Sequence, residues 1–144
     1  MKLFPLLAAG ALMAAAPTFA GDIEAGEKDF KKCKACHMVV SADGEEIYKG
    51  GKTGPNLYGV FGRQAGSLEG FKYGKDLVAA GAAGLVWDEA QFVEYVQNPA
   101  AFLKANLNKP NAVAKMAFKL KDAATAEDVY AYLAQFGAAP AATE

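Results

Sequence analysis

The sequence predicts an all-α protein in which helices alternate with long loops. Apolar residues recur at helical spacing near the end of the chain, where Val129, Tyr132, Leu133 and Phe136 share one face. No segment shows a convincing strand-like alternation, and glycines interrupt residues 41–70 too often for regular structure. The apolar faces of the predicted helices are narrow, so they need an additional apolar group to complete a core.

Capping and stop signals place the expected helices along the chain. Asp22 is a suitable N-cap, Asp88 with Gln91 forms a capping box, and Thr125 with Asp128 forms a similar pair at the last helix. Helices begin after such residues because their side chains accept the free backbone N–H groups of the first turn. The predicted helices cover residues 22–32, 75–80 with Gly81 as the end, 88–97, a segment beginning at Pro99, and 125–136 with Gly137 as the end.

The two cysteines and the one histidine of the chain all lie in the segment Cys33-Lys34-Ala35-Cys36-His37. This is the C-x-x-C-H pattern of covalent haem attachment, in which each thiol adds to a vinyl group and the histidine binds the iron. A zinc site would need about four ligands, and a disulfide-exchange motif would need a βαβ frame that the sequence does not show. We therefore predict one haem c, bound through Cys33 and Cys36 with His37 as an axial ligand.

The second axial ligand of the predicted haem has to come from elsewhere in the chain. Met38 follows His37 directly and cannot reach the opposite haem face, whereas Met116 lies far along the chain after a polar loop. Lys115 is a rival, but removing its proton at pH 7 costs about 4 to 5 kcal/mol. We expect Met116 near neutrality, and displacement of Met116 by a lysine in alkali, with loss of the methionine-to-iron absorption band above pH ~10. His–Met ligation fills both axial positions and favours electron exchange.

The ends of the chain have different compositions from its middle. Residues 1–20 have the features of a cleaved secretory signal peptide, with Lys2, an apolar stretch and a small-residue site ending at Ala20. Residues 21–137 are the expected haem domain, and residues 138–144 are an expected flexible tail. No later stretch has the ~20 apolar residues of a membrane span, so no membrane anchor is expected. The chain has 15 basic and 16 acidic residues, and this balance gives no indication of nucleic-acid binding.

Further short motifs accompany the haem motif across residues 21–137. They are Gly26 and Phe30, Thr53-Gly54-Pro55-Asn56-Leu57-Tyr58-Gly59, Phe61-Gly62-Arg63, Gly70-Phe71-Lys72-Tyr73, Trp87, Glu94-Tyr95-Val96, Asn98-Pro99, Lys115-Met116 and Ala131-Tyr132-Leu133. With these motifs the sequence resembles the class I c-type cytochromes, and specifically the long subgroup of bacterial cytochrome c2. The resemblance implies a class I cytochrome c domain over 21–137, with helices and long loops wrapped around one covalently bound haem.

The resemblance also implies roles for individual residues around the haem. The Pro55 carbonyl would accept the ring N–H of His37, Tyr95 would lie near the sulfur of Met116, and Phe118 would cover the haem edge. The haem propionates, which are costly to bury without partners, would be held by Arg63, Tyr73 and Trp87.

Other implications of the resemblance concern packing and departures from the family pattern. Gly26 and Phe30 would pack against Tyr132 where the first and last helices cross. Ala114 stands where many relatives have a hydroxyl residue that reaches a propionate, and alanine offers no such donor. The stretches from His37 to Pro55 and from Asn98 to Met116 are longer than in mitochondrial relatives, which leaves the conformation of the 99–115 loop open.

The function implied by the resemblance is electron transfer rather than catalysis. The protein would be a monomer of the periplasm that carries single electrons from a cytochrome bc complex to a photosynthetic reaction centre or a terminal oxidase. We expect a positive rim around the haem edge that steers redox partners, formed by Lys32, Lys52, Lys115, Lys119 and Lys121. Two alternatives are an open-site haem enzyme or gas sensor, which tight carbon monoxide binding would indicate, and a tightly held subunit of a larger redox complex, against which purification as a monomer would argue.

Overall fold

The computed structural model describes residues 21–137, so the predicted signal peptide and C-terminal tail lie outside the described residues. Helices dominate the described chain, as the sequence predicts, and long irregular segments join them. The elements in order are α1 (Ile23–Asp29), η1 (Phe30–Lys32, a 3₁₀ helix), β1 (Val39–Val40), β2 (Glu46–Tyr48), α2 (Lys75–Ala82), α3 (Glu89–Gln97), α4 (Pro99–Asn106) and α5 (Ala123–Leu133).

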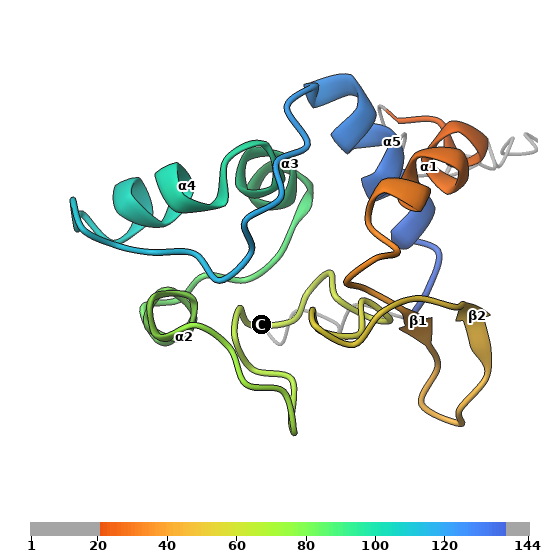
Figure 1. Ribbon diagram of the computed structural model, residues 1–144, viewed down its shortest axis with the longest axis horizontal. Helices are drawn as coiled ribbons and strands as arrows, with labels where there is room; N and C mark the ends of the chain where they lie inside the picture. The colour runs from red at the N-terminus through yellow and green to blue at the C-terminus, as the bar shows by residue number, and fades with distance from the viewer. Residues whose placement is uncertain (1–20, 138–144) are drawn as a thin grey trace, which may run out of the picture.

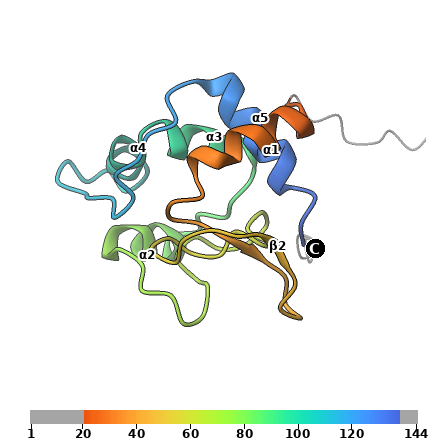
Figure 2. The ribbon, with the colours of Figure 1, turned by 45° about the vertical axis from the view of Figure 1, so that its right-hand side comes forward.

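The helices and loops form two layers. Helices α1, α3, α4 and α5 lie together on one side, while α2, the β1–β2 hairpin and the loops around them lie on the other (Figures 1 and 2). Within the helical layer α5 packs against α1 and α3, and α3 packs against α4; α2 contacts α4 from the other layer.

Two predicted N-caps are confirmed, and the one predicted for the last helix is wrong. Asp22 and Asp88 each accept a backbone N–H three residues on, at 2.8 Å. The last helix begins at Ala123 rather than at Thr125, because the Asp122 carboxylate accepts the N–H of Thr125 at 2.8 Å and its hydroxyl at 2.7 Å. The true cap therefore precedes the predicted one by three residues.

Neither of the two glycines expected to end helices, Gly81 and Gly137, directly follows the last residue of its helix. Helix α2 continues through Gly81 to Ala82, and Gly81 is buried against the backbone carbonyl of Ala65, where a side chain has no room. The chain reverses at Gly84, whose φ of +107° favours glycine. Helix α5 ends at Leu133, before Gly137.

The expectation of a chain without strands is also wrong. β1 and β2 pair antiparallel as a short two-stranded sheet, with Val39 opposite Tyr48. Strands of two and three residues are too short for a recognisable alternation of side chains. The hairpin contributes to the core, because the Tyr48 ring meets the buried Phe30 ring edge-on with centroids 4.8 Å apart.

The crossing of α1 and α5 has the predicted composition. Gly26 is buried so close to the backbone carbonyl of Asp128 that a β-carbon would overlap it. The Phe30 ring is fully buried and lies 5.7 Å from the Tyr132 ring. The absent side chain of Gly26 thus permits the close approach on which this contact depends.

Candidate haem site

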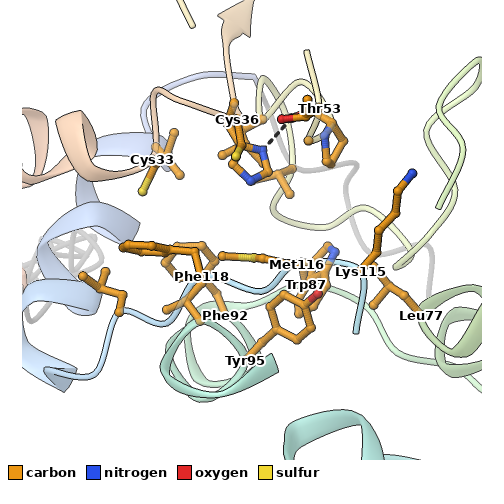
Figure 3. Close-up of a pocket in the computed structure, with 18 of the residues that line it drawn as sticks. Cys33, Cys36, Thr53, Leu77, Trp87, Phe92, Tyr95, Lys115, Met116 and Phe118 are labelled. Atoms are coloured by element: carbon orange, nitrogen blue, oxygen red, sulfur yellow. Dashed lines mark hydrogen bonds between the residues drawn. The ribbon is translucent and has the colours of Figure 1, made fainter. Parts of the chain in front are cut away.

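An apolar cavity of about 450 Å³ lies between the two layers. Figure 3 shows Cys33 and Cys36 on one side of it and Met116 and Phe118 on the opposite side. His37 also lines the cavity. Every residue predicted to attach or ligate a haem therefore reaches one enclosed space. Apolar lining is contributed by Leu57, Val60, Leu77, Phe92, Val96, Leu120, Val129 and Leu133.

A tight turn presents the two thiols and the histidine. The N–H of Cys33 donates to the Phe30 carbonyl at 2.8 Å, which continues from the 3₁₀ turn. The Cys33 carbonyl then accepts the N–H groups of Cys36 at 3.1 Å and His37 at 3.0 Å. The turn brings three residues of one short motif to the cavity wall, and its geometry follows from their spacing.

The imidazole of His37 is oriented by the segment around Pro55. Its Nδ1 lies 2.8 Å from the Pro55 carbonyl oxygen, the contact that the family resemblance implies. A carbonyl only accepts hydrogen bonds, so Nδ1 carries the proton and Nε2 keeps its lone pair. Burial lowers the pKa of His37, while the hydrogen bond to Pro55 acts to raise it. The ring is consequently neutral and able to bind a metal through Nε2.

Asn56 fixes this segment against the first strand, a contact that the sequence analysis did not predict. Its side-chain Nδ2 donates to the Val40 carbonyl at 2.7 Å. Its Oδ1 accepts the N–H groups of Val40 at 3.0 Å and Tyr58 at 3.1 Å. Asn56 thereby holds the Pro55 carbonyl in place from the neighbouring residue.

Met116 is half-buried in the opposite wall, on the irregular segment between α4 and α5. Tyr95 from α3 lies beneath it in Figure 3 and also lines the cavity. The Tyr95 ring packs against Trp87 at 5.0 Å and Phe102 at 5.5 Å. Burial raises the pKa of Tyr95 to about 12, so its hydroxyl stays protonated at neutral pH.

Lys115, the rival ligand of the sequence analysis, has other contacts in the structure. Its Nζ donates to the Lys72 carbonyl at 2.6 Å and lies 5.2 Å from the centroid of the Phe71 ring. Both contacts engage the Nζ of Lys115. Methionine is thus the better candidate near neutrality.

The candidate propionate residues line one region of the cavity. Arg63 and Trp87 are brought together because their segments run antiparallel, with the Trp87 N–H donating to the Arg63 carbonyl at 3.0 Å. The Arg63 guanidinium donates to the Asn56 carbonyl at 3.1 Å. Burial lowers the pKa of Arg63, with the neighbouring Tyr73 opposing that shift; arginine nevertheless stays protonated in proteins. The Arg63 cation, beside Tyr73 and Trp87, can bind an anionic group.

Phe118 and the five predicted docking lysines differ in how they are placed relative to the cavity. The Phe118 side chain lines the cavity and is 42% exposed. All five lysines of the expected rim are exposed, and two of them, Lys32 and Lys115, line the cavity. Lys32 also forms an ion pair of 2.5 Å with Asp29, which offsets its charge. The lysines are therefore unequal in the positive charge that they present.

A buried carboxylate, Asp76, was not predicted from the sequence. Asp76, the second residue of α2, is the only charged residue classed as buried among residues 21–137, at 2% exposure. It binds Lys109 and the N–H of Val113 from the loop that leads to Met116. An acid at a helix start is ordinarily explained by the helix dipole, so the sequence carries no signal for these distant partners.

The donor set fits a haem c and no other common cofactor. Two unpaired thiols, a neutral imidazole and a thioether face one apolar space, and a guanidinium lies beside it. Thioether linkage uses both thiols, and the imidazole and thioether are the ligand types of an electron-transfer haem. The fold and the site thus define a class I c-type cytochrome.

Comparisons with known proteins agree with this class. No protein-family model matches the chain. A cytochrome c-551 of Roseobacter denitrificans is 65% identical over 121 residues, covering 83% of this chain and 85% of the relative. A cytochrome c2 of Rhodobacter capsulatus is 56% identical over 124 residues, covering 86% of this chain and 89% of the relative.

Solved structures give the same result for the fold. The cytochrome c2 structure from Rhodobacter sphaeroides matches with a TM-score of 0.80 and 50% identity, covering 83% of this chain and 99% of the other. That from Rhodobacter capsulatus matches with a TM-score of 0.77 and 53% identity, over 80% and 97% of the two chains. The chain belongs to the bacterial cytochrome c2 family. It is an electron-transfer protein that carries one haem c, covalently bound through Cys33 and Cys36.

Among residues 21–137, no helix is both long enough and apolar enough to cross a bilayer.

Proposed function

We propose that this protein carries single electrons through the periplasm, with His37 and Met116 as the two axial ligands of its haem. Electrons would come from a cytochrome bc complex and go to a photosynthetic reaction centre or a terminal oxidase, and the carrier would be a monomer in solution. The observation that carries the proposal is the placement of His37 and Met116 on the same cavity as both cysteines. Bound haem supplies the one-electron couple of its iron.

The protein's own residues would set the conditions for that couple. The Pro55 carbonyl keeps the proton of His37 on Nδ1, which would leave the lone pair of Nε2 available to the iron. Met116 contributes a thioether, which needs no proton loss before it can bind iron. Tyr95 and Trp87 form the wall behind Met116 and exclude water from that side. With both axial positions filled, substrates have no access to the metal.

The remaining site residues would anchor the cofactor and the partner. Arg63, Tyr73 and Trp87 line one region of the cavity and are suited to hold the propionates. The exposed Phe118 would leave one edge of the haem close to solvent and thus to a partner. Docking would depend on long-range attraction from the lysine rim, because transient redox contacts are small. The rim would consist of Lys32, Lys52, Lys115, Lys119 and Lys121.

Visible spectra of both oxidation states, combined with a redox titration, test the proposed ligation. We expect a methionine-to-iron absorption band in the ferric protein and no carbonyl complex when carbon monoxide is added to the ferrous protein. The variant Met116→Ala should lose the band and bind carbon monoxide. An unchanged band in this variant would contradict Met116 as the ligand.

Cell fractionation tests the proposed location. Export predicts that haem-containing protein is found in the periplasmic fraction and that its N-terminus begins near Gly21. Recovery of the unprocessed chain in the cytoplasm would contradict the proposal. Reduction by a purified cytochrome bc complex, and oxidation by a reaction centre or oxidase, test the partners separately from the location.

A further inference from the structure

Asp76 joins helix α2 to the loop that carries Met116. Its Oδ1 accepts a hydrogen bond from Nζ of Lys109 at 2.6 Å, and its Oδ2 accepts the backbone N–H of Val113 at 2.8 Å. The Asp76 side chain is 2% exposed, while that of Lys109 is 40% exposed. A buried carboxylate is thus bound through both oxygens by two residues of one distant loop.

The loop between α4 and α5 has no regular structure of its own over residues 107–122. Two hydrogen bonds from its backbone to other elements flank Met116. The Val113 N–H donates to Asp76 before it, and the Leu120 N–H donates to the Val96 carbonyl at 2.8 Å after it. These two backbone hydrogen bonds, together with the hydrogen bond from the Lys115 side chain to the Lys72 carbonyl, hold the loop around Met116.

The Asp76 contact is suited to be the stronger of the two. Charge-assisted hydrogen bonds are stronger than the neutral kind formed by Leu120, and removing one partner of a buried charge leaves that charge without compensation. Val113 lies three residues before Met116, so at most roughly 10 Å of extended chain separates the two residues. Release of Val113 would therefore loosen the chain close to Met116.

We propose that Asp76 is a positioning residue for Met116. Together with Lys109 it forms a clamp that keeps the loop closed, so that the thioether stays at its place in the cavity. The inference rests on the proposed role of Met116 as an axial ligand. Asp76 itself does not line the cavity. Its effect on the iron would be exerted entirely through the loop.

Imidazole binding to the ferric holoprotein measures how readily the loop opens, because imidazole can bind only after Met116 has left the iron. The variant Asp76→Ala removes both hydrogen bonds, and we expect it to bind imidazole on the order of tenfold more tightly than the parent protein. Asp76→Asn keeps an acceptor for Val113 but loses the ion pair, so its affinity should be intermediate. The readout is loss of the methionine-to-iron band during titration.

Lys109 provides a second, milder test. Lys109→Gln should also increase imidazole affinity, and Lys109→Arg, which keeps the charge and the donor, should restore it to nearly the parent value. Because Lys109 is partly exposed, these variants are expected to fold even where Asp76→Ala does not incorporate haem. If Lys109→Gln binds imidazole as the parent does, the clamp is excluded.

Asp22→Ala is the matched control for a loss of stability alone. It removes the N-cap of α1, which belongs to the other end of the fold. It should lower the denaturation midpoint and leave imidazole affinity unchanged. An equal increase in this control would show that Asp76 acts only through stability, which would overturn the inference.

The experiment separates failure of the clamp from failure of the proposed ligation. If the parent protein lacks the methionine-to-iron band, or if Met116→Ala keeps it, the ligand assignment fails. If the parent has the band and Asp76→Ala binds imidazole with parental affinity, the clamp fails and the ligand assignment stands.

Discussion

At the scale of single residues, Gly54 sets how closely the chain approaches the histidine. A β-carbon at this position would lie 2.7 Å from Nδ1 of His37 and closer still to Cε1. The imidazole is held by its hydrogen bond to the Pro55 carbonyl and cannot turn away without losing it. The glycine is thus required by the space around the ring.

We therefore predict that Gly54→Ala displaces the His37 ring. Visible spectra should show weaker binding of His37 to the haem iron, and the yield of correctly attached haem should fall. Gly26→Ala is the control, because a β-carbon there overlaps a backbone carbonyl just as severely, but at the α1–α5 crossing. It should lower stability while leaving the haem spectrum of the folded protein unchanged. A normal spectrum for Gly54→Ala would contradict the prediction.

At the scale of elements, the β1–β2 hairpin packs against the contact between α1 and α5. The Phe30 ring is fully buried and lies between Tyr132 of α5 and Tyr48 of β2. The sequence analysis expected only the contact with Tyr132. Because Phe30 immediately precedes the haem turn, this cluster links the helical layer to the start of the cavity wall.

Truncation of this ring should affect stability without affecting the redox chemistry. Phe30→Ala is expected to reduce the free energy of unfolding by about 3–5 kcal/mol, because it removes a fully buried aromatic ring. Denaturant titration measures this loss, and redox titration should give the parental potential. Ile23→Ala, at a residue of α1 that is 43% exposed, should cost far less. An equal loss of unfolding free energy in Phe30→Ala and Ile23→Ala would argue against a stabilising role for the Phe30 contacts.

At the scale of the whole molecule, the distribution of charge decides how the protein meets its partners. The acidic residues Glu24, Glu27 and Asp29 lie on α1, whereas Lys119 and Lys121 lie exposed on either side of Leu120, which lines the cavity. The two groups carry opposite charge in a chain whose total charge is nearly balanced. Such an asymmetry orients the protein in the field of a charged partner.

Lys119→Gln should slow association with an acidic redox partner at low ionic strength. The difference from the parent protein should vanish at high salt, because exposed charges are screened over about 3 Å at 1 M. Stopped-flow electron transfer measures the rate. Lys104→Gln on α4, an exposed lysine outside the expected rim, is the matched control and should behave as the parent does. Equal effects of the two substitutions would remove the case for a localised rim.

Stability should also fall on acidification, and Asp76 should account for part of the loss. The hydrogen bond from Lys109, followed by that from Val113, lowers the pKa of Asp76 in the folded protein. Its stabilising contribution is thus complete above the unfolded pKa of about 3.9 and is lost as pH falls through the lower folded pKa. The difference in unfolding free energy between the parent and Asp76→Asn should therefore shrink between pH 7 and pH 3. A constant difference would contradict this linkage.

The sequence by itself determined the haem attachment, the family and most of the helices. These features depend on local spacing: two cysteines and a histidine in one turn, and caps such as Asp22 and Asp88 that bond three residues away. Local rules failed where more than one residue can cap a helix. Asp122 is the N-cap of the last helix, whereas the sequence predicts Thr125. They also failed for the strands, which are too short to show a period.

Only the tertiary structure decided how distant segments meet at the cavity. Asn56 holds the segment that orients His37, and Asp76 holds the loop of Met116, each through hydrogen bonds to residues far along the chain. A polar side chain can bond any compatible group that folding brings near it, so its sequence neighbours do not reveal the partner. The motif thus determines that a haem is bound, whereas these long-range contacts fix the two residues proposed to bind its iron.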